Sequence, residues 1–276
     1  MTSIQATRTV DSMSAWSARR MGRRWLLVQT GRGVVGVAVL GMAACSASEP
    51  SATDSGSPSP SESTTPSDAA PSESDPGAAA AELAWSRVNL GFVSAYVLVR
   101  GREAAVVDTG VAGSVDAIVD VLDEAGPGVS GVRHVILTHK HPDHAGSINE
   151  VLAATPKATG YVGTADLSEV DATQRLTPLD DGDEVFGLQL VGTPGHTAGH
   201  LAVFDPDTGV LVAGDALTNM GQLAGSNPQF TEDELAAAES VRKLAQLAPR
   251  TILVGHGEPV VDGASAALEE LARSLS

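Results

Sequence analysis

The sequence predicts an α/β layered fold from about residue 82 onward. Short apolar runs typical of strands alternate there with segments whose apolar residues recur at helical spacing. Hydrophobic residues make up 42% of the chain but aromatic residues only 3%, so the core must consist mainly of Val, Leu, Ala and Ile. Alternating strands and helices are expected to form sheets that helices cover.

The first half of this domain is predicted to contain two strands, a helix, a strand and a helix. These elements occupy residues 95–99, 104–107, 115–125, 132–137 and 145–154. The first two strands form a hairpin, because only the turn at residues 100–103 separates them. Gly126-Pro127-Gly128 ends the first helix, since neither residue type continues a helix well.

The second half is predicted to contain four strands and two helices. The strands occupy residues 188–191, 201–204, 210–213 and 251–254, and the helices residues 231–247 and 264–275. A turn rich in Asp and Gly at residues 205–209 joins the second and third of these strands. Thr231, followed three residues later by Glu234, predicts a capped helix start.

Residues 1–44 are predicted to be an export signal. Six of the 17 basic residues lie there, and an apolar stretch at residues 33–44 follows them. That stretch is too short to cross a bilayer, which takes about 20 apolar residues. Arg23-Arg24 resembles a twin-arginine signal, and a general basic start is the alternative. Either Met1 or Met21 begins the signal.

A lipid anchor is predicted at Cys45. The run Leu40-Gly41-Met42-Ala43-Ala44-Cys45 resembles a bacterial lipobox, which implies a lipidated cysteine on the extracytoplasmic face of the cell membrane. Cys45 is the one cysteine of the chain, which excludes an intrachain disulfide and a cysteine-rich metal site. Residues 45–81 are rich in Ser and Pro and predict a disordered tether before a hydrolase domain at residues 82–276.

The charge of the chain limits its partners. The formal net charge is -17, and from residue 45 onward 11 basic residues stand against 33 acidic ones. An acidic surface repels the phosphates of nucleic acids and of anionic lipids. We therefore expect a small-molecule substrate, no nucleic acid, and membrane contact only through Cys45.

A cluster of histidines directly follows the strand predicted at residues 132–137. It reads His139-Lys140-His141-Pro142-Asp143-His144. Alternate residues of an extended backbone project to the same side, so His139 and His141 are expected to face one point. Asp143 and His144 enter a turn and face a neighbouring point. Imidazole and carboxylate donors suit zinc, and burying unpaired imidazoles would cost free energy, so the cluster predicts a metal site.

Three further donors follow other predicted strands, each beside a glycine. They are His196, Asp215 and His256. Glycine permits a close backbone approach, and loops at strand ends commonly carry functional groups on a rigid scaffold. These donors are expected to join the histidine cluster.

Taken in order, these motifs resemble those of the metallo-β-lactamase superfamily over residues 90–275. The five matching positions are Asp108, the cluster at residues 139–144, His196, Asp215 and His256. The resemblance implies an αββα sandwich, two mixed sheets flanked by helices, with two zinc ions at the edge between the sheets. It implies one zinc on His139, His141 and His196, and a second on Asp143, His144 and His256. It further implies that Asp215 bridges the ions and that Asp108 orients the ligand loop.

The bridging Asp215 favours the hydroxyacylglutathione hydrolase and lactonase side of the superfamily, because members that destroy β-lactams generally carry another residue type there. The expected reaction is hydrolysis of an ester, lactone or thioester by metal-activated water, with Asp143 shuttling the proton. The glutathione thioesterases of this side carry an additional C-terminal helical region. Since 20 residues follow His256, a glutathione thioester is not the expected substrate.

Three alternatives remain open at this point. A mononuclear iron dioxygenase acting on persulfides shares the fold and much of the histidine pattern. A non-catalytic metal-binding lipoprotein is less favoured, because scavenging needs no bridging carboxylate. Phosphodiester hydrolysis on the same fold is the third.

The remaining polar residues near the motifs have less specific roles. His134 and His200 are expected to be structural, and Thr138 to help cap the ligand loop. Lys140 is expected to point to solvent or to meet an anionic substrate. The uncharged segment at residues 216–229 is expected to line the substrate pocket.

Overall fold

The computed structural model describes residues 82–275. The predicted signal at residues 1–44, the lipidation site Cys45 and the tether at residues 45–81 lie outside the described residues. Within residues 82–275, no helix is both long enough and apolar enough to span a bilayer.

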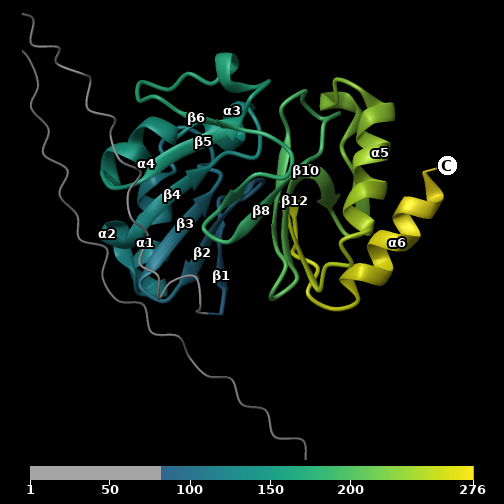
Figure 1. Cartoon of the computed structure of the whole chain (residues 1–276), viewed down its shortest axis with the longest axis horizontal. Coiled ribbons are helices and arrows are strands. Elements are labelled where there is room, and N and C mark those ends of the chain that lie inside the picture. The colour runs from purple at the N-terminus through teal and green to yellow at the C-terminus, as the bar shows by residue number, and fades with distance from the viewer. Residues whose placement is uncertain (1–81, 276) are drawn as a thin grey trace, which may run out of the picture. The chain divides into compact units, whose positions relative to one another are not determined.

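Six strands form the first sheet in the order of the chain (Figure 1). They are β1 (Ala84–Asn89), β2 (Ser94–Arg100), β3 (Glu103–Val107), β4 (Val132–Ile136), β5 (Thr159–Gly163) and β6 (Thr177–Leu179). The first three strands are antiparallel neighbours, and β3 to β6 run parallel. The sheet is therefore mixed, as predicted.

Six further strands form the second sheet. They are β7 (Glu184–Val185), β8 (Leu188–Gly192), β9 (Leu201–Asp205), β10 (Val210–Asn219), β11 (Leu223–Gly225) and β12 (Thr251–Gly257). The path runs β11-β10-β9-β8-β7, and β12 pairs in parallel with β10. This sheet is mixed as well.

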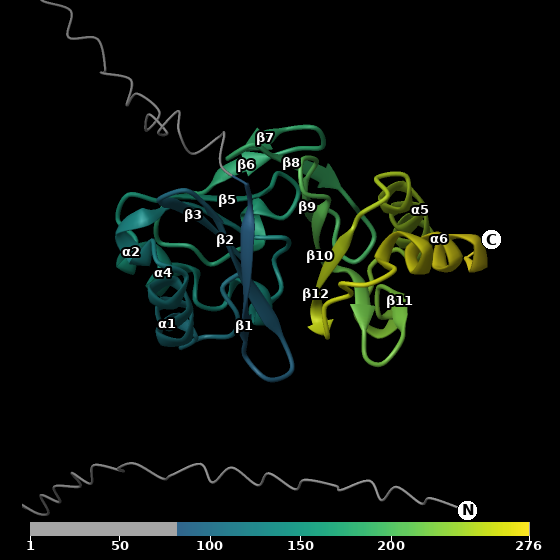
Figure 2. The ribbon, with the colours of Figure 1, turned by 90° about the horizontal axis from the view of Figure 1, so that it is seen from below.

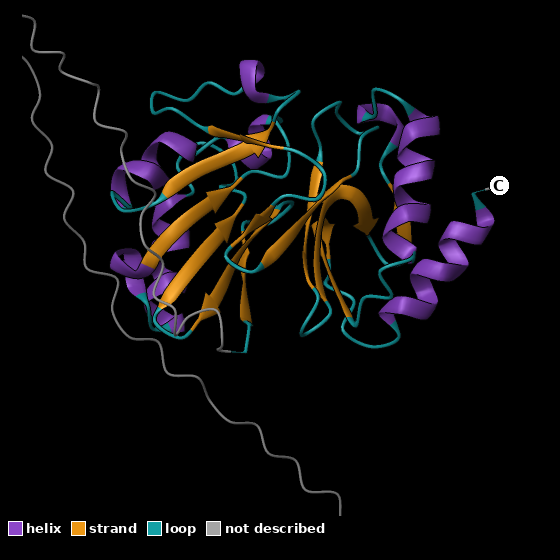
Figure 3. Cartoon of the chain, in the orientation of Figure 1, coloured by secondary structure: helices purple, strands orange, loops and turns teal. Residues whose placement is uncertain are grey.

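Helices cover the outer face of each sheet (Figure 3). The α-helices are α1 (Val115–Ala125), α2 (Gly128–Gly131), α3 (Pro142–Ala145), α4 (Ile148–Ala154), α5 (Glu234–Ala245) and α6 (Ala264–Ser274). Two 3-10 helices, η1 (Leu167–Glu169) and η2 (Pro228–Phe230), lie in connecting loops. Figure 2 shows α1, α2 and α4 on one flank and α5 and α6 on the other.

Three buried apolar clusters hold these layers together. One cluster lies between the sheets, where Tyr96 and Val107 of the first sheet pack with Leu190 and Val203 of the second. The other two fill the spaces between each sheet and its helices, around Leu122 on one side and residues of α5 and α6 on the other. Removing this apolar area from water is the main term that favours folding. The predicted αββα architecture is confirmed.

The helix predicted at residues 145–154 is wrong in its start. The structure has two short helices, α3 and α4, because the chain breaks at Gly146. The Gly146 N–H donates to the carbonyl of Gly110 at 2.8 Å, and a Cβ on Gly146 would lie 2.3 Å from the Pro142 carbonyl oxygen. This tertiary contact replaces the helical hydrogen bonding that the apolar spacing suggested.

The cap predicted at Thr231 is also wrong. Helix α5 begins after Asp233, whose Oδ1 accepts hydrogen bonds from the N–H groups of Leu235 and Ala236, each at 3.0 Å. The hydroxyl of Thr231 instead donates to the carbonyl of Asn227 at 2.7 Å. The carboxylate two residues later therefore takes the capping role.

Candidate metal centre

The ligand loop follows β4, as the sequence predicts. Pro142 occupies the first turn of α3 and holds His141 in extended backbone, with φ -62 and ψ 145. His139 and His141 therefore lie in extended chain before α3, while Asp143 and His144 lie within its single turn. One short segment thus presents donors in two directions.

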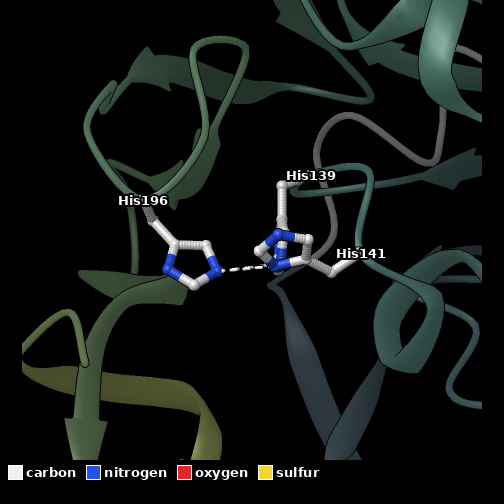
Figure 4. A group of neighbouring side chains, drawn as sticks. All are labelled: His139, His141 and His196. Carbon is white, nitrogen blue, oxygen red and sulfur yellow. Dashed lines mark hydrogen bonds between the residues drawn. The ribbon is translucent and has the colours of Figure 1, made fainter. Parts of the chain in front are cut away.

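Three imidazole rings converge from two loops (Figure 4). We call His139, His141 and His196 the three-histidine group. The Nε2 of His139 lies 3.1 Å from the Nδ1 of His141, and the Nε2 of His196 lies 3.2 and 2.9 Å from these two atoms. Ligand nitrogens of a tetrahedral zinc ion, each about 2.0–2.1 Å from the metal, lie roughly 3.3 Å apart. The separations fit such an ion closely.

Burial favours neutral rings at His139 and His196. Burial lowers the pKa of His139 well below its ordinary value and lowers the pKa of His196 to about 4. A neutral imidazole keeps a lone pair on one ring nitrogen, which is the form that binds metals. These rings are therefore ready to act as ligands near neutral pH.

A second set of donors lies beside the first. We call Asp143, His144 and His256 the mixed group. The Nε2 of His256 lies 3.3 Å from the Oδ2 of Asp143, and the Nε2 of His144 lies 3.9 Å from the same oxygen. Asp143, and then Asp215, raise the pKa of His256 to about 10. The negative charge of Asp143 and Asp215, which favours a proton on His256, would also attract a divalent cation.

Asp215 lies between the two groups. Its Oδ2 is 3.5 Å from the Nε2 of His196 and 3.2 Å from the Nε2 of His256, and its Oδ1 is 3.2 Å from the Nε2 of His144. Burial favours protonation of this carboxyl, but the nearby His144 overcomes it and holds the pKa of Asp215 well below its usual range. An ionised carboxylate therefore faces donors of both groups.

Two glycines make room for this arrangement. Gly214 has φ 52, and the pairing of β10 with β12 is irregular around it, which turns Asp215 toward the site. A Cβ on Gly255 would lie 2.2 Å from the Oδ1 of Asp215. Asp215 lies inside β10, which continues to Asn219, so the predicted strand end at residue 213 is wrong.

Two buried atoms support a bound metal directly. The Nε2 of His144 and the Oδ1 of Asp215 are both buried, lie 3.2 Å from each other and make no hydrogen bond to any other described residue. Buried polar atoms that lack a partner are rare because each costs free energy. A cation between the groups would satisfy both atoms, so the residues present fit the metal that the sequence predicts.

Asp108 supports the mixed group through its contact with His144. Its Oδ2 lies 2.8 Å from the Nδ1 of His144, and its Oδ1 accepts a hydrogen bond from the N–H of Thr138 at 2.7 Å. With a metal bound, the Nδ1–H of His144 would donate to Asp108, which would leave the Nε2 lone pair for the metal. Asp108 has φ 63, an unusual backbone conformation for a residue other than glycine. Thr138 anchors the ligand loop, in line with the prediction.

The buried histidine His200 supports Asp215 and belongs to neither group. Its Nε2 accepts a hydrogen bond from the Asp215 N–H at 3.1 Å, and its Nδ1 lies 2.7 Å from the Thr193 hydroxyl. Burial lowers the pKa of His200 to about 3, so the ring is neutral. The predicted structural role is confirmed. His134 packs against Tyr161 and Phe186, which agrees with a structural role.

The side chain of Lys140 is held in two ion pairs and does not point to solvent. Its ammonium group lies 2.6 Å from Glu169 and 2.8 Å from Glu232, and these two hydrogen bonds raise the pKa of Lys140. The prediction that Lys140 points to solvent is therefore wrong, because its side chain is only 12% exposed. The ion pairs depend on residues 29 and 92 positions along the chain, which the sequence pattern does not link.

Two supporting contacts have no sequence signature. The Ser226 hydroxyl lies 2.9 Å from the Nδ1 of His196, and the Phe92 carbonyl lies 2.7 Å from the Nδ1 of His256. Each fixes which ring nitrogen faces the site. A backbone carbonyl can come from any residue type, so only the fold reveals it. Ser226 brings part of the uncharged segment at residues 216–229 to the site.

Comparison with known protein families decides the family. Residues 88–256 match the family model of the metallo-beta-lactamase superfamily. The chain belongs to the metallo-beta-lactamase superfamily. All seven predicted ligands, and Asp108, lie within the matched residues.

Several known proteins of this superfamily resemble the chain. The probable metallo-hydrolase YflN of Bacillus subtilis strain 168 is 33% identical over 216 residues, covering 62% of this chain and 81% of that protein. A hydroxyacylglutathione hydrolase of Cereibacter sphaeroides is 36% identical over 163 residues, covering 56% of this chain and 57% of that enzyme. A solved metallo-beta-lactamase family protein of Thermus thermophilus matches with a TM-score of 0.56 at 26% identity, covering 70% of this chain and 79% of that one. The chain is thus a superfamily metallo-hydrolase with candidate metal-binding His and Asp groups.

Proposed function

We propose that this protein is a dinuclear zinc hydrolase that cleaves an ester, lactone or thioester. The position of Asp215 carries the proposal, because its two carboxylate oxygens face the three-histidine group and the mixed group at 3.2–3.5 Å. A scavenging site for a single ion needs no carboxylate shared between two donor sets. Each side would offer three donors of its own and a share of Asp215, and zinc can take a fifth ligand, which would be the reacting water.

Each group of this chain has a distinct part in the proposed reaction. When bound, two zinc ions would lower the pKa of a water molecule so that hydroxide forms near neutral pH and a substrate carbonyl is polarised. The side chain of Asp143 is 28% exposed and therefore accessible from solvent. The hydrogen bond from His256 holds the pKa of Asp143 below its usual range, so the carboxylate is ionised and would hold a proton only transiently. Asp143 would then return that proton to the leaving group.

The surroundings of His256 favour a substrate with an apolar group. The ring of Phe92 stacks on the His256 ring with centroids 6.1 Å apart, yet Phe92 is 61% exposed. Met220 is 79% exposed and follows Asn219 in the chain. The Asn219 carbonyl accepts a hydrogen bond at 3.1 Å from the N–H of Glu258, two residues after His256. Two exposed apolar side chains beside one metal ligand can remove an acyl chain from water.

Nearby cations are already engaged. The ammonium group of Lys140 lies in two ion pairs, and Arg87 pairs with Glu258 at 2.7 Å while donating to the Gly257 carbonyl. Neither is free to meet a substrate carboxylate. We therefore propose that the acyl group of the substrate is apolar and uncharged.

Metal content of the purified protein tests the proposal. We expect two zinc ions per chain by elemental analysis, and their loss in the His139→Ala and Asp215→Ala variants. We also expect the zinc-loaded protein to hydrolyse 4-nitrophenyl esters, lactones or thioesters at a rate that a chelator abolishes. A protein with two tightly bound ions but no turnover of any of these substrates would contradict the hydrolase proposal.

A persulfide dioxygenase is the second candidate. One structural neighbour is described as a di-iron-bound form, and at 24% identity it shares the fold alone. The same metal analysis separates the candidates. One iron ion per chain, with oxygen consumed on addition of a persulfide, would replace the hydrolase proposal.

We also propose that the protein is exported and anchored to the membrane through Cys45. The basic start, the apolar stretch at residues 33–44 and the lipobox-like run at residues 40–45 support this. Metabolic labelling with palmitate should modify the full chain but not a Cys45→Ser variant. An unlabelled, unprocessed protein in the soluble fraction would refute the anchor.

A further inference from the structure

The buried carboxylate of Asp166 touches the first of the two loops that carry the three-histidine group. Asp166 lies just after β5 and is fully buried. Its Oδ2 accepts a hydrogen bond from the backbone N–H of Lys140 at 3.1 Å. Lys140 stands between His139 and His141, so this contact fixes the backbone that joins two of the ligands.

The same carboxylate also holds the second loop. Its Oδ2 accepts a hydrogen bond from the Thr197 hydroxyl at 2.6 Å, and its Oδ1 accepts one from the Gly199 N–H at 2.8 Å. Thr197 directly follows His196. One buried side chain therefore joins the segment of His139 and His141 to the segment of His196.

Close glycine packing brings this carboxylate into place. A Cβ on Gly163 would lie 1.9 Å from the Gly199 carbonyl oxygen, and a Cβ on Gly199 would lie 2.4 Å from the Asp166 nitrogen. Any larger residue at either position would push β5 and the His196 loop apart. The two backbones are thus in direct contact next to Asp166.

An ion pair on the outside provides a weaker second link. The ammonium group of Lys140 lies 2.8 Å from Glu232, and Glu232 also accepts a hydrogen bond from the Ala198 N–H at 3.1 Å. Both glutamate partners of Lys140 are exposed, so water and salt screen this link. The buried Asp166 is not screened in this way, so its three hydrogen bonds are the stronger link between the loops.

We propose that Asp166 is a positioning residue that sets the separation of His196 from His139 and His141, and thereby the metal affinity of the three-histidine group. The inference rests on the proposed function, which assigns a zinc ion to that group. Asp166 itself contributes no ligand atom. It acts through the backbone and hydroxyl groups that it holds.

The substitution Asp166→Asn tests this role with a minimal change in size. The two oxygens of Asp166 accept from three donors, whereas an asparagine has one oxygen and an NH2 group in place of the other. If the NH2 group replaces Oδ1, it faces the N–H of Gly199, and if it replaces Oδ2, it faces the N–H of Lys140. Two donors facing each other cannot form a hydrogen bond. At least one link between the two loops is lost. Thr197→Val removes a single hydroxyl donor and is the milder variant.

Zinc affinities of the full chain provide the first readout. We expect one of the two ions to bind about tenfold more weakly in Asp166→Asn, as is typical for residues that orient ligands, while the other changes less than twofold. His141→Ala and His256→Ala identify which ion belongs to which group. Thr197→Val should weaken the same ion by a smaller factor.

Asp205→Asn is the matched control. Asp205 is equally buried and accepts hydrogen bonds from Arg100 and Thr208, but it lies at the opposite end of β9 from His200. It should lower thermal stability without changing either zinc affinity. If Asp166→Asn behaves like Asp205→Asn, with lower stability and two unchanged affinities, the positioning role is refuted.

Hydrogen exchange of the metal-free chain provides a second readout that needs no metal. The N–H groups of Lys140 and Gly199 should be protected in the natural protein and should exchange at least tenfold faster in Asp166→Asn. Fast exchange of both groups in the natural protein would overturn the inference. A chain that fails to bind two ions but shows this protection would overturn the proposed function alone.

Discussion

Replacing Asp108 with asparagine is predicted to weaken the metal ion of the mixed group. The Asp108 carboxylate lies 2.8 Å from the Nδ1 of His144 and holds Thr138 by its N–H and its hydroxyl. Asparagine keeps one acceptor oxygen but loses the charge. It also tolerates the left-handed backbone at φ 63, so a change would arise from the side chain and not from backbone strain.

The size of the effect follows from what His144 loses. A charge-assisted hydrogen bond contributes about 1.5–3 kcal/mol, and outer residues that orient metal-bound histidines typically account for 10–100-fold in metal affinity. A 10–100-fold change corresponds to about 1.4–2.7 kcal/mol, which agrees with the loss of one such bond. We therefore expect the zinc of the mixed group to dissociate 10–100 times more readily.

Competition with a chelator of known affinity measures this change. The zinc of the three-histidine group serves as the comparison, because Asp108 touches neither His141 nor His196 and reaches His139 only through Thr138, whose Oγ1 lies 3.0 Å from the Nδ1 of His139. It should stay within about twofold of its original affinity. A folded Asp108→Asn protein that binds both ions as tightly as the natural chain would refute the assigned role of Asp108.

The other predictions concern stability, substrate choice and pH. Arg100→Met should destabilise the fold by about 3–5 kcal/mol, because it leaves the carboxylate of Asp205 charged in the interior, where the two groups now lie 2.7 Å apart. Thermal unfolding should show this loss, and an Arg100→Met, Asp205→Leu double variant that is no more stable than the single one would contradict it. Phe92→Ala should reduce the kcat/KM ratio of 4-nitrophenyl octanoate to acetate about fivefold, since apolar contact near His256 is lost. Val261→Ala, another exposed apolar position, should leave that ratio unchanged, and an equal effect of both variants would count against the apolar contact. Burial lowers the pKa of His134 from 6.5 to about 4. As the pH falls from 6.5 toward 4, the unfolded chain therefore takes up a proton that the folded chain does not bind, and the free energy of unfolding decreases. His134→Phe should therefore gain about 2 kcal/mol relative to the natural chain between pH 7.5 and pH 5 in urea unfolding, and a pH-independent difference would exclude this cause.

The predictions made from local pattern agree best with the structure. The helix at residues 115–125 and the strands around residues 95–107 have the predicted bounds to within two residues. Their apolar spacing and turn residues are local properties, and nothing distant competes with them. The short edge strands β6, β7 and β11 have no such pattern, because exposed or two-residue strands need few apolar side chains.

Two of the failed predictions involve a competing contact from another part of the chain. Gly146 breaks a helix because Gly110 accepts its N–H, and Lys140 is occupied because Glu169 and Glu232 reach it. Such contacts depend on which loops become neighbours after folding. The helix start at Asp233 in place of Thr231 has a local origin, since Thr231 is engaged with Asn227, four residues earlier.

The sequence by itself determined which residue types are available for chemistry. The run at residues 139–144, with His196, Asp215 and His256 beside glycines, pointed to metal chemistry because few other roles require so many donors close to strand ends. Only the tertiary structure decided how those donors are grouped, which ring nitrogens face the site and which buried carboxylates hold them. Asp108 and Asp166 reach their partners across about 30 residues of chain, and hydrogen bonds of that kind exist only once the two sheets have packed and excluded water.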